Sequence, residues 1–585
     1  MIRSISTRVS RSLHHRIGER TVSVSPKLCS DVFTSKCRYY CVERAIYLKI
    51  DSQNVVSSGF PDVSGFENVL LHDFIWENIE KWWDHTALEC SITGRSYTYG
   101  QLRKACSKLA TSLRKNNLLP GDKIAIVLPN IPEFVIVLLA AHEAGLCTVL
   151  ISPAGTVYEI RRQIKDTDVR AIFTNSVKCA DVQASIETNS HIKLPIIVAN
   201  DGTESASIPG TIDLNDLIRD DIEDFNKKCD VTAEDTVVLA FSSGTTGLPK
   251  AVETRHRNIV VNILQRTHPM LFPALEATKY HQEIVPLILP AYHFFALALT
   301  LYCYLRIGAK IVCLPYFVKD NFIRLLENHK CTTLQAVPPI IQMMANDERV
   351  TSRHVESMKD VVLGGAPFGN ESISMFLSRV GDVPIVQGYG MTELSPIASI
   401  GTPRVPKTSV GYLVANTQMR IASIDDPGRN LGPNEIGELC IRGPQVMKGY
   451  YKNAQATADT MDGDWLKTGD LGYYSENGLL YFHARLKELI KVKGHQVAPI
   501  ELEEIIRGHD KVQDVAVIGV AHDKYGEIPK AFVVPKPGAK IDENELKHFV
   551  AKHVSKYKQL GYVQIVESIP KTMSGKILRK ELRKM

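Results

Sequence analysis

Apolar and amphipathic segments alternate in the first half of the chain, and this alternation indicates the fold class. The runs 123–128, 147–151 and 169–173 are apolar and predict strands, whereas residues 131–144 and 157–165 between them predict helices. Strands that alternate with helices form a largely parallel sheet, because right-handed crossovers place the helices on its faces. We therefore expect an α/β fold with doubly wound sheets, whose ligands bind beyond the carboxyl ends of the strands.

The pattern changes towards the C-terminus, where short strands surround a charged amphipathic helix. The predicted elements there are a helix at 543–557 and strands at 514–520, 531–534 and 563–566. This arrangement is typical of a small α+β domain. We expect a large domain over residues 46–486 and a small, mobile domain over 487–585. The joint lies near Arg485–Lys487, just after a strand predicted at 479–483.

One uncharged stretch, residues 284–305, is long enough to span a bilayer. Pro286 and the segment Pro290–His293 interrupt it, which favours a buried strand, a turn, and a buried helix that begins at Phe294. A transmembrane helix is the alternative.

Composition narrows the class of protein. The 585 residues are 44% hydrophobic and 23% charged, with a formal net charge of +5, as in a globular enzyme of more than one domain. Lys and Arg form no stripe interleaved with aromatic residues, so nucleic acid is not an expected partner. The cysteines form no CxxC pair and have no zinc-finger spacing, so we expect reduced thiols in an intracellular compartment.

The N-terminal residues 1–45 differ from the rest. Their first 18 residues contain four arginines, no acidic residue, and apolar residues spaced by three or four. This composition is typical of a mitochondrial presequence, and a disordered basic tail in a cytoplasmic protein is the alternative. A fluorescent fusion of residues 1–45 distinguishes them by its location. The C-terminus carries no Ser-Lys-Leu peroxisomal signal.

A loop rich in glycine and hydroxyl groups follows the apolar strand predicted at 236–240. Its glycines let the backbone approach an anion, its hydroxyls and N–H groups can surround phosphate oxygens, and its lysine adds positive charge. The spacing is not that of a Walker A loop, and a generic Ser/Gly loop is the alternative. The residues expected to contact phosphate are Ser242, Ser243, Gly244, Thr245, Thr246, Gly247 and Lys250.

Six further segments occur in a fixed order with this loop, at 289–296, 364–367, 387–393, 464–470, 485–499 and 570–576. Together they resemble the motifs of the adenylate-forming superfamily: acyl-CoA synthetases, 4-coumarate–CoA ligases, beetle luciferases and adenylation domains of peptide synthetases. The resemblance covers residues 65–585. It implies an enzyme that uses ATP and Mg²⁺ to convert a carboxylic acid to an acyl-adenylate and then forms a thioester with coenzyme A.

The resemblance implies roles for single residues in the first half-reaction. The carboxylate and ATP are both anions and must come together, so cations and hydroxyls are needed to offset the charge that develops on the phosphates. Lys576 would bridge the carboxylate and the α-phosphate, Thr392 would contact that phosphate, and Glu393 would hold Mg²⁺, for which one carboxylate is sufficient. Without the motifs, Lys576 reads as a solvated lysine of a basic tail.

The nucleoside would contact a second set of residues. Asp470 and Arg485 match the acid and the arginine that contact the ribose, although Asp470 alone reads as an ordinary turn residue. Tyr389 would stack on adenine. The other adenine contacts implied by the resemblance are Gly365, Ala366, Pro367, Gln387 and Gly388.

The second half-reaction implies a rotation of the small domain about Lys487. Lys576 would then leave the site and the segment with Lys491 would replace it. Lys493 and Gly494 would contact CoA, with Gly494 leaving room for its arm. His293 would form a gate between the acid and the thiol, although a lone histidine in an apolar run is more often a core residue.

The expected acid pocket is apolar and includes His293, Phe295, Gly364, Gly388 and Pro396. An apolar pocket suits a fatty or an aryl acid. We favour a medium- or long-chain fatty acid, with an aryl or 4-coumarate-type CoA ligase, or a luciferase-like enzyme, as the alternative. A catalytically silent adenylate-binding protein is the alternative from a different class, and it would be expected to lose Lys576 or Glu393.

Three positions depart from the family pattern. Ala251 replaces a usual glycine after the loop lysine, which would distort the loop if that site needs a positive φ. Tyr316 stands where plant ligases carry a lysine for CoA, and His495 replaces a more usual aromatic residue. None of them removes a principal catalytic group.

Overall fold

The computed structural model describes residues 49–585 except 187–190, 200–207, 226–228, 243–248, 367, 493–494, 523–524 and 573–574. The presequence predicted at 1–45 lies outside the described residues, and the mitochondrial location stays a prediction.

The predicted α/β fold is confirmed in an eight-stranded sheet whose order is β21-β11-β10-β6-β5-β7-β8-β9. The strands β10, β6, β5, β7, β8 and β9 run parallel to one another, and β11 forms an antiparallel hairpin with β10. The bounds are β5 Lys123–Val127, β6 Cys147–Leu150, β7 Val169–Asn175, β8 Ile197–Ala199, β9 Ile212–Asp213, β10 Thr236–Ser242, β11 Lys250–Arg255 and β21 Gly449–Tyr450. Its crossover helices are α6 Pro132–Glu143, α7 Val157–Asp166 and α8 Ser176–Ser185.

Two further sheets complete the parallel part of the large domain. One has the order β14-β15-β16-β17-β18, with β14, β15 and β16 parallel, and the other has the order β12-β13-β3-β4. The strands are β14 Thr333–Ala336, β15 Asp360–Leu363, β16 Ile385–Gly390, β17 Ile397–Ile400, β18 Tyr412–Leu413, β12 Ile284–Leu287, β13 Lys310–Cys313, β3 Thr86–Cys90 and β4 Ser96–Thr98. The helices are α4 Leu71–Trp76, α5 Tyr99–Lys115, α9 His256–Arg266, α12 Lys319–Asn328, α13 Pro338–Asn346 and α14 Asn370–Val380.

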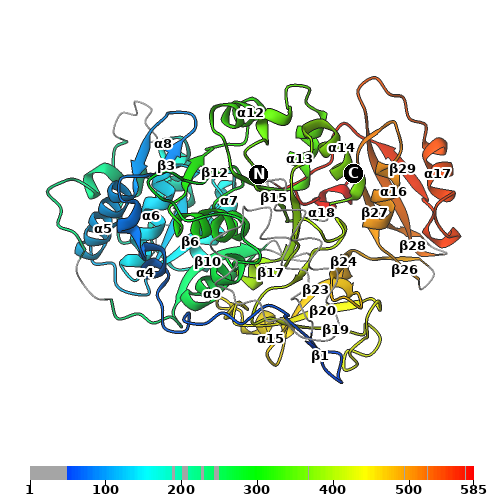
Figure 1. The fold of residues 1–585 in the computed structure, drawn as a ribbon, viewed down its shortest axis with the longest axis horizontal. Coiled ribbons are helices and arrows are strands. Elements are labelled where there is room, and N and C mark those ends of the chain that lie inside the picture. Colours follow the sequence, from blue (N-terminus) through cyan, green and yellow to red (C-terminus); the bar gives the residue numbers. More distant parts are fainter. Residues whose placement is uncertain are drawn as a thin grey trace, which may run out of the picture. The chain divides into compact units, whose positions relative to one another are not determined.

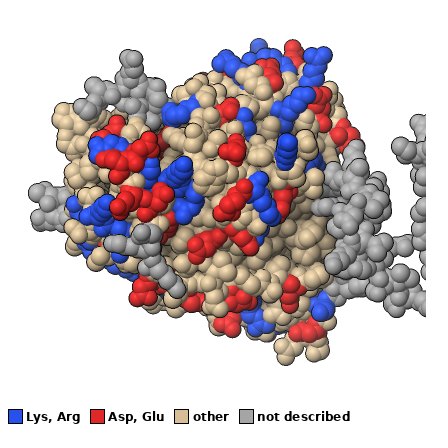
Figure 2. Space-filling model, turned by 60° about the vertical axis from the view of Figure 1, so that its left-hand side comes forward, with Lys and Arg blue, Asp and Glu red and all other residues tan. Residues whose placement is uncertain are grey.

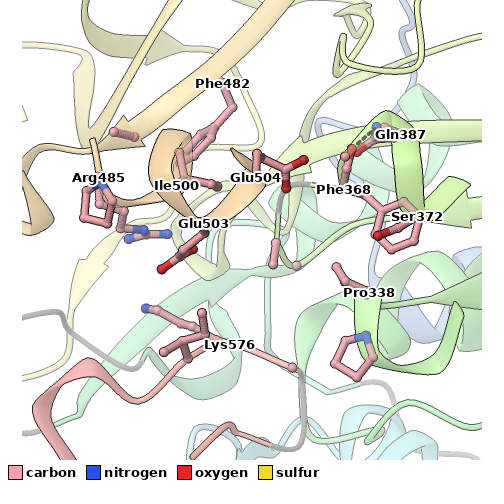
Figure 3. Close-up of a pocket in the computed structure, with 18 of the residues that line it drawn as sticks. Pro338, Phe368, Ser372, Gln387, Phe482, Arg485, Ile500, Glu503, Glu504 and Lys576 are labelled. Atoms are coloured by element: carbon pink, nitrogen blue, oxygen red, sulfur yellow. Dashed lines mark hydrogen bonds between the residues drawn. The ribbon is translucent and has the colours of Figure 1, made fainter. Parts of the chain in front are cut away.

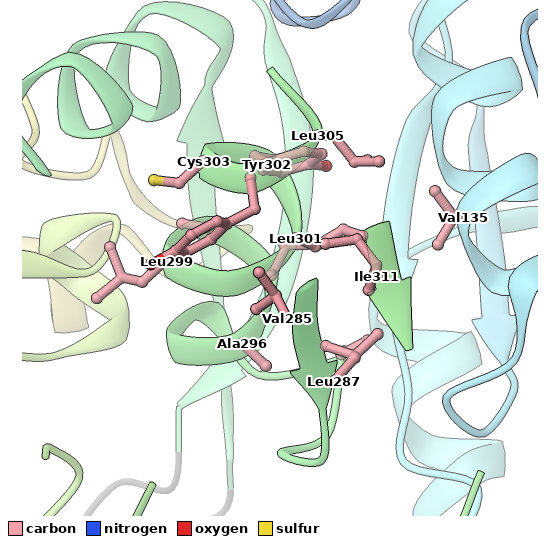
Figure 4. Close-up of a cluster of buried hydrophobic side chains, with 14 of the residues drawn as sticks. Val135, Val285, Leu287, Ala296, Leu299, Leu301, Tyr302, Cys303, Leu305 and Ile311 are labelled. Carbon is pink, nitrogen blue, oxygen red and sulfur yellow. The ribbon is translucent and has the colours of Figure 1, made fainter. Parts of the chain in front are cut away.

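The uncharged stretch 284–305 forms a buried strand and a buried helix, as the prolines predicted. The helix runs through α10 (Phe294–Ala296), a π-helical turn (Leu297–Tyr302) and α11 (Cys303–Leu305). Its side chains pack against β12, β13 and α6 (Figure 4). Among the described residues, no helix is long and apolar enough to cross a membrane. The stretch lacks charge because core burial would leave a charge unsolvated.

A seven-stranded antiparallel sheet follows, which the strand–helix alternation did not predict. Its order is β1-β2-β19-β20-β23-β22, with β24 paired to β23. The strands are β1 Lys49–Ile50, β2 Val56–Ser57, β19 Gln418–Ala422, β20 Gly437–Arg442, β22 Met461–Asp462, β23 Trp465–Tyr474 and β24 Leu480–Arg485, and helix α15 (Ala454–Thr460) precedes β22. The large domain is therefore not built of parallel sheets alone.

The chain leaves this sheet at Arg485 and enters a separate five-stranded sheet at Ile490, which encloses the expected joint. The small domain is coloured orange to red in Figure 1. Its elements are β25 Ile490–Val492, β26 His495–Val497, α16 Pro499–Arg507, β27 Val512–His522, β28 Gly526–Pro535, α17 Glu543–Ala551, β29 Tyr562–Ile565 and α18 Arg579–Leu582. Helix α17 ends at Ala551, not at 557, and the chain turns so that the ring of Tyr557 stacks on His495 with centroids 4.4 Å apart.

Charges of both signs alternate over the face shown in Figure 2, and no basic stripe stands out there. Inside the fold, the buried carboxylates of α6 are paired: Glu133 with Arg95 at 2.6 Å and Glu143 with Arg103 at 2.9 Å. The described cysteines are all free, and all but Cys229 are buried.

Candidate active site

Four of the five predicted catalytic residues line one cavity of about 400 Å³ beyond the ends of β10 and β16, and Lys491 does not. Its lining includes residues from every one of the sequence motifs and from both domains. Among them are Ser242, Lys250, His293, Gly365, Thr392, Glu393, Gly469, Arg485, Lys487 and Lys576. The phosphate-loop residues Ser243, Gly244, Thr245, Thr246 and Gly247 lie outside the described residues, as does Pro367.

Lys250 starts β11 at the phosphate end of the cavity. Its Nζ lies 4.6 Å from the ring centroid of Tyr450, in the geometry of a cation–π contact. Ala251 follows in regular β structure, pairs with Phe241 across the hairpin, and is not among the described residues with positive φ. This position therefore needs no glycine, and Ala251 does not distort the strand that follows the loop.

Glu393 stands in a short 3₁₀ turn, Thr392–Leu394, directly after β16. Its side chain is 5% exposed, and its Oε1 accepts a 2.9 Å hydrogen bond from the Tyr450 hydroxyl. Among the described residues, no group of three or more His, Cys, Asp and Glu could hold a metal by itself. A Mg²⁺ ion that arrives with ATP needs only one or two carboxylates beside phosphate oxygens and water, and Glu393 next to Thr392 fits that donor set.

The ribose end is organised by direct cross-strand pairing of Asp470 on β23 with Arg485 on β24. Asp470 is 1% exposed, and its Oδ2 accepts a 2.9 Å hydrogen bond from the Tyr389 hydroxyl. Its Oδ1 lies 3.0 Å from Arg485 Nε but receives no well-aligned hydrogen bond. Burial raises the pKa of Asp470 and the charge of Arg485 opposes this shift. The Oδ1 atom is thus a buried acceptor beside the nucleotide cavity.

The residues expected to contact adenine line a second cavity of about 160 Å³, which shares the lining residues Gly365, Gly390, Arg485 and Lys576 with the first. Gly365, Ala366, Gln387, Gly388 and Tyr389 all line it, as the motifs predicted, together with small-domain residues from α16. Figure 3 shows Lys576 and Arg485 directed towards this space.

Lys576 reaches the cavity from a tight turn near the C-terminus, in which Thr572 N–H donates to Lys576 O at 2.8 Å. Burial lowers the pKa of Lys576, and the neighbouring Arg485 lowers it further. Gly575, just before it, has φ +80°, and a Cβ there would lie 2.7 Å from Pro339 Cδ at the start of α13. Glycine therefore lets the turn seat against the large domain.

Gly575→Ala is expected to lower acid-dependent ATP/pyrophosphate exchange by about tenfold or more. A positive φ costs a side-chain-bearing residue ~1–2 kcal/mol, and the contact with Pro339 adds a steric cost. Gly538→Ala is the matched control, because Gly538 has φ +77° but no atom within 4 Å of the place that an alanine methyl group would take. Equal loss of exchange in both variants would attribute the effect to backbone strain alone.

The residues expected to form the acid pocket lie around a third cavity, of about 160 Å³, between α10 and the strands β15 and β16. The structure brings together all five of them, His293, Phe295, Gly364, Gly388 and Pro396, in the lining of this cavity. Phe295 Cζ lies 3.2 Å from where a Gly364 Cβ would be, so a larger residue at 364 would close the pocket. The sequence reasoning missed Leu299, Val362 and Met391, which also line it.

His293 lines both the acid pocket and the phosphate cavity, at the N-cap of α10. Its ring lies 4.6 Å from the ring of Tyr292, centroid to centroid, and burial lowers its pKa to about 4. The imidazole is therefore neutral near pH 7, and it lies at the position expected for a gate between two sites.

Lys491, expected to act in the second half-reaction, does not line the cavity. Lys491 is exposed on β25, and Lys493 and Gly494 lie outside the described residues. Tyr316 is also exposed, at 48%. The structure thus brings Lys576 to the site and leaves Lys491 on the surface, while the proposed hinge residue Lys487 is exposed at the cavity rim.

Comparison with protein families identifies the class. Residues 75–451 match the AMP-binding enzyme family and residues 501–576 match the AMP-binding enzyme C-terminal domain. The chain belongs to this family. It is an ATP-dependent, AMP-forming acid–CoA ligase, as its motifs predicted.

Individual relatives agree with this assignment. The chain is 36% identical to 4-coumarate–CoA ligase 1 of Arabidopsis thaliana over 91% of its length and 95% of that protein. It is 34% identical to 4-coumarate–CoA ligase 3 of Oryza sativa subsp. japonica, over 90% of its length and 94% of the relative. The fold is similar to ATP-bound MatB from Rhodopseudomonas palustris, with a TM-score of 0.79 at 24% identity, covering 88% of this chain and 98% of MatB.

Proposed function

We propose that the substrate is a compact aryl or arylalkenyl carboxylic acid, and not the medium- or long-chain fatty acid that the sequence alone favoured. The relatives from Arabidopsis thaliana and Oryza sativa are 4-coumarate–CoA ligases, which supports the aryl alternative. The acid pocket supports it too, because its volume of about 160 Å³ is small beside the ~300–1,000 Å³ of common ligand pockets. A long alkyl chain would need more room than the pocket offers.

The pocket chemistry adds a preference within the aryl acids. Its described lining is largely aromatic and aliphatic, with Phe295, Leu299 and Ile397. The lining contains no charged side chain, because its one histidine, His293, is neutral near pH 7. A buried ring hydroxyl without a partner would lose hydrogen bonds to water. The pocket therefore suits a ring with an apolar distal edge.

In the proposed first half-reaction, this chain's residues offset the charge that develops as the carboxylate attacks the α-phosphate. Lys576 contributes an ammonium to the cavity that Thr392 also lines, and Lys250 would bind the departing pyrophosphate. Glu393 and Thr392 would hold Mg²⁺, which neutralises phosphate charge when it is bound. Asp470 and Tyr389 fix the nucleoside so that the α-phosphate faces the acid pocket.

In the proposed second half-reaction, the small domain rotates about the segment at Lys487. The chain between β24 and β25 is short and bears an exposed lysine, which suits a hinge. Rotation would withdraw Lys576 and bring Lys491 towards the adenylate. His293 would then shift its ring to admit the CoA thiol to the acyl carbon.

Acid-dependent ATP/pyrophosphate exchange across a panel of acids tests the substrate. Cinnamate is expected to support faster exchange than 4-coumarate, and both to exceed palmitate, with CoA thioester formed only when CoA is added. Octanoate is the matched apolar acid without a ring. Faster exchange with palmitate or octanoate than with any aryl acid would contradict the aryl assignment, and no exchange with any acid would contradict the enzyme class.

A further inference from the structure

A short segment, Met447–Tyr451, is hydrogen-bonded both to the turn that carries Glu393 and to the strand that begins at Lys250. Met447 N–H donates to the carbonyl of Glu393, and Tyr451 N–H donates to the carbonyl of Ala251, both at 2.9 Å. Residues 449–450 form β21, which pairs with β11 just after Lys250. The segment is therefore bonded on one side to the turn that carries Glu393 and on the other to the strand that Lys250 begins.

The side chain of Tyr450 contacts both of these functional groups. Its hydroxyl donates to Glu393 Oε1 at 2.9 Å, and Lys250 Nζ lies 4.6 Å from its ring centroid. Tyr450 is 8% exposed, and its own N–H donates to Thr457 Oγ1 at 2.9 Å, which ties the segment to α15. One well-anchored ring thus holds a cation on its face and an anion at its hydroxyl.

This arrangement separates two opposite charges that would otherwise attract each other. A lysine and a glutamate facing one buried cavity gain from direct pairing, and a closed pair would have to open before phosphate and Mg²⁺ could bind. A ring face attracts an ammonium only weakly, so the phosphates of ATP can displace it. The hydroxyl occupies one carboxylate oxygen and leaves the other available.

We propose that Tyr450 is a positioning residue that keeps Lys250 and Glu393 apart and oriented, each ready for its part of Mg²⁺-bound ATP. Tyr450 lies outside every sequence motif and takes part in neither half-reaction as a reacting group. Its two contacts have separable consequences. The hydroxyl acts on Glu393 and therefore on Mg²⁺, whereas the ring acts on Lys250 and therefore on the phosphates.

Two variants separate the contacts. Tyr450→Phe keeps the ring and removes the hydroxyl, and it is expected to raise the Mg²⁺ concentration for half-maximal ATP/pyrophosphate exchange about tenfold, in line with a lost hydrogen bond to a charged group. ATP binding measured by calorimetry in EDTA should stay within about twofold of the parent. Tyr450→Leu removes the ring too, and it is expected to weaken metal-free ATP binding by about fivefold or more.

Tyr451→Phe is the matched control. The Tyr451 hydroxyl donates to Asp168 at 3.0 Å, away from the cavity lining, so its loss removes a comparable tyrosine–carboxylate bond without touching the site. Mg²⁺ dependence and metal-free ATP binding should be unchanged in this variant. The proposal is overturned if Tyr450→Phe leaves the Mg²⁺ dependence unchanged, or if Tyr450→Leu binds metal-free ATP as the parent does. It is also overturned if Tyr451→Phe reproduces the shifts, since a general loss of stability would then explain them.

Discussion

Replacing Lys576 by alanine is expected to lower the rate of acyl-adenylate formation by about 10²–10⁴-fold, a few kcal/mol of transition-state stabilisation. The Lys576 side chain is partly buried and lines the cavity that also holds Thr392 and Glu393, whereas the other small-domain cation of the lining, Lys487, is exposed. In the proposed first half-reaction, Lys576 would bring positive charge to the place where the carboxylate and α-phosphate meet. ATP/pyrophosphate exchange with the best acid of the panel measures the effect.

The same variant should retain thioester formation from supplied acyl-adenylate and CoA. Lys491→Ala is its matched control, because Lys491 is exposed on β25 and does not line the cavity. It should retain exchange and lose thioester formation. Equal loss of both half-reactions in either variant would contradict the rotation of the small domain.

The exchange rate should also depend on pH through the titration of Lys576. Burial, and then the charge of Arg485, lower the pKa of Lys576 below the usual lysine value. The catalytic cation is present below this lowered pKa and is lost as pH rises through it. The rate of exchange by the parent should therefore fall at a pH below the pKa of an exposed lysine. This fall at alkaline pH should be absent in Lys576→Ala.

Asp470→Asn is expected to raise the KM for ATP by about 10²-fold with a smaller effect on kcat. The carboxylate offers a buried acceptor, Oδ1, and hydrogen bonds to a charged group contribute ~1.5–3 kcal/mol each. An amide loses the charge that balances Arg485, whose Nε lies 3.0 Å away. Steady-state kinetics with varied ATP measure the change.

Comparison of ATP with 2′-deoxyATP shows whether the loss occurs at the ribose. The parent should have a lower KM for ATP than for 2′-deoxyATP. In Asp470→Asn the two KM values should be much closer, because the charged acceptor for the ribose hydroxyl has been removed. Asp462→Asn is the control, because Asp462 pairs with Arg420 in the same sheet but outside the nucleotide cavities. Undiminished discrimination in Asp470→Asn would place the ribose elsewhere.

Strand and helix alternation predicted the parallel sheet well because those elements are local. The apolar run 123–128 and the helix 131–144 needed only neighbouring residues to define them, and β5 and α6 follow closely. The prediction extended helix α17 to 557 because the 3.6-residue pattern continues to Tyr557, whereas the helix ends at Ala551 and the Tyr557 ring stacks on His495. The antiparallel sheet was missed because its pairings join distant segments, such as β2 with β19.

Tyr450 shows the same limit at the site. Its hydroxyl donates to Glu393, 57 residues earlier, and its ring faces Lys250 at the end of the phosphate loop. No spacing rule connects those three positions along the chain. The sequence around Tyr450, Met447–Tyr450, matches neither a strand nor a helix period, so local pattern gave no reason to select this tyrosine.

The sequence by itself determined the class of chemistry, because ordered motifs carry the groups that phosphate, ribose and carboxylate require regardless of how they are brought together. Tertiary structure decided which of those groups act at once. Cross-strand pairing places Arg485 beside Asp470. Gly575 lies close to Pro339, and the next residue, Lys576, lines the cavity while Lys491 stays on the surface. Such contacts depend on pairing and packing between distant segments, which local hydrophobic periodicity does not encode.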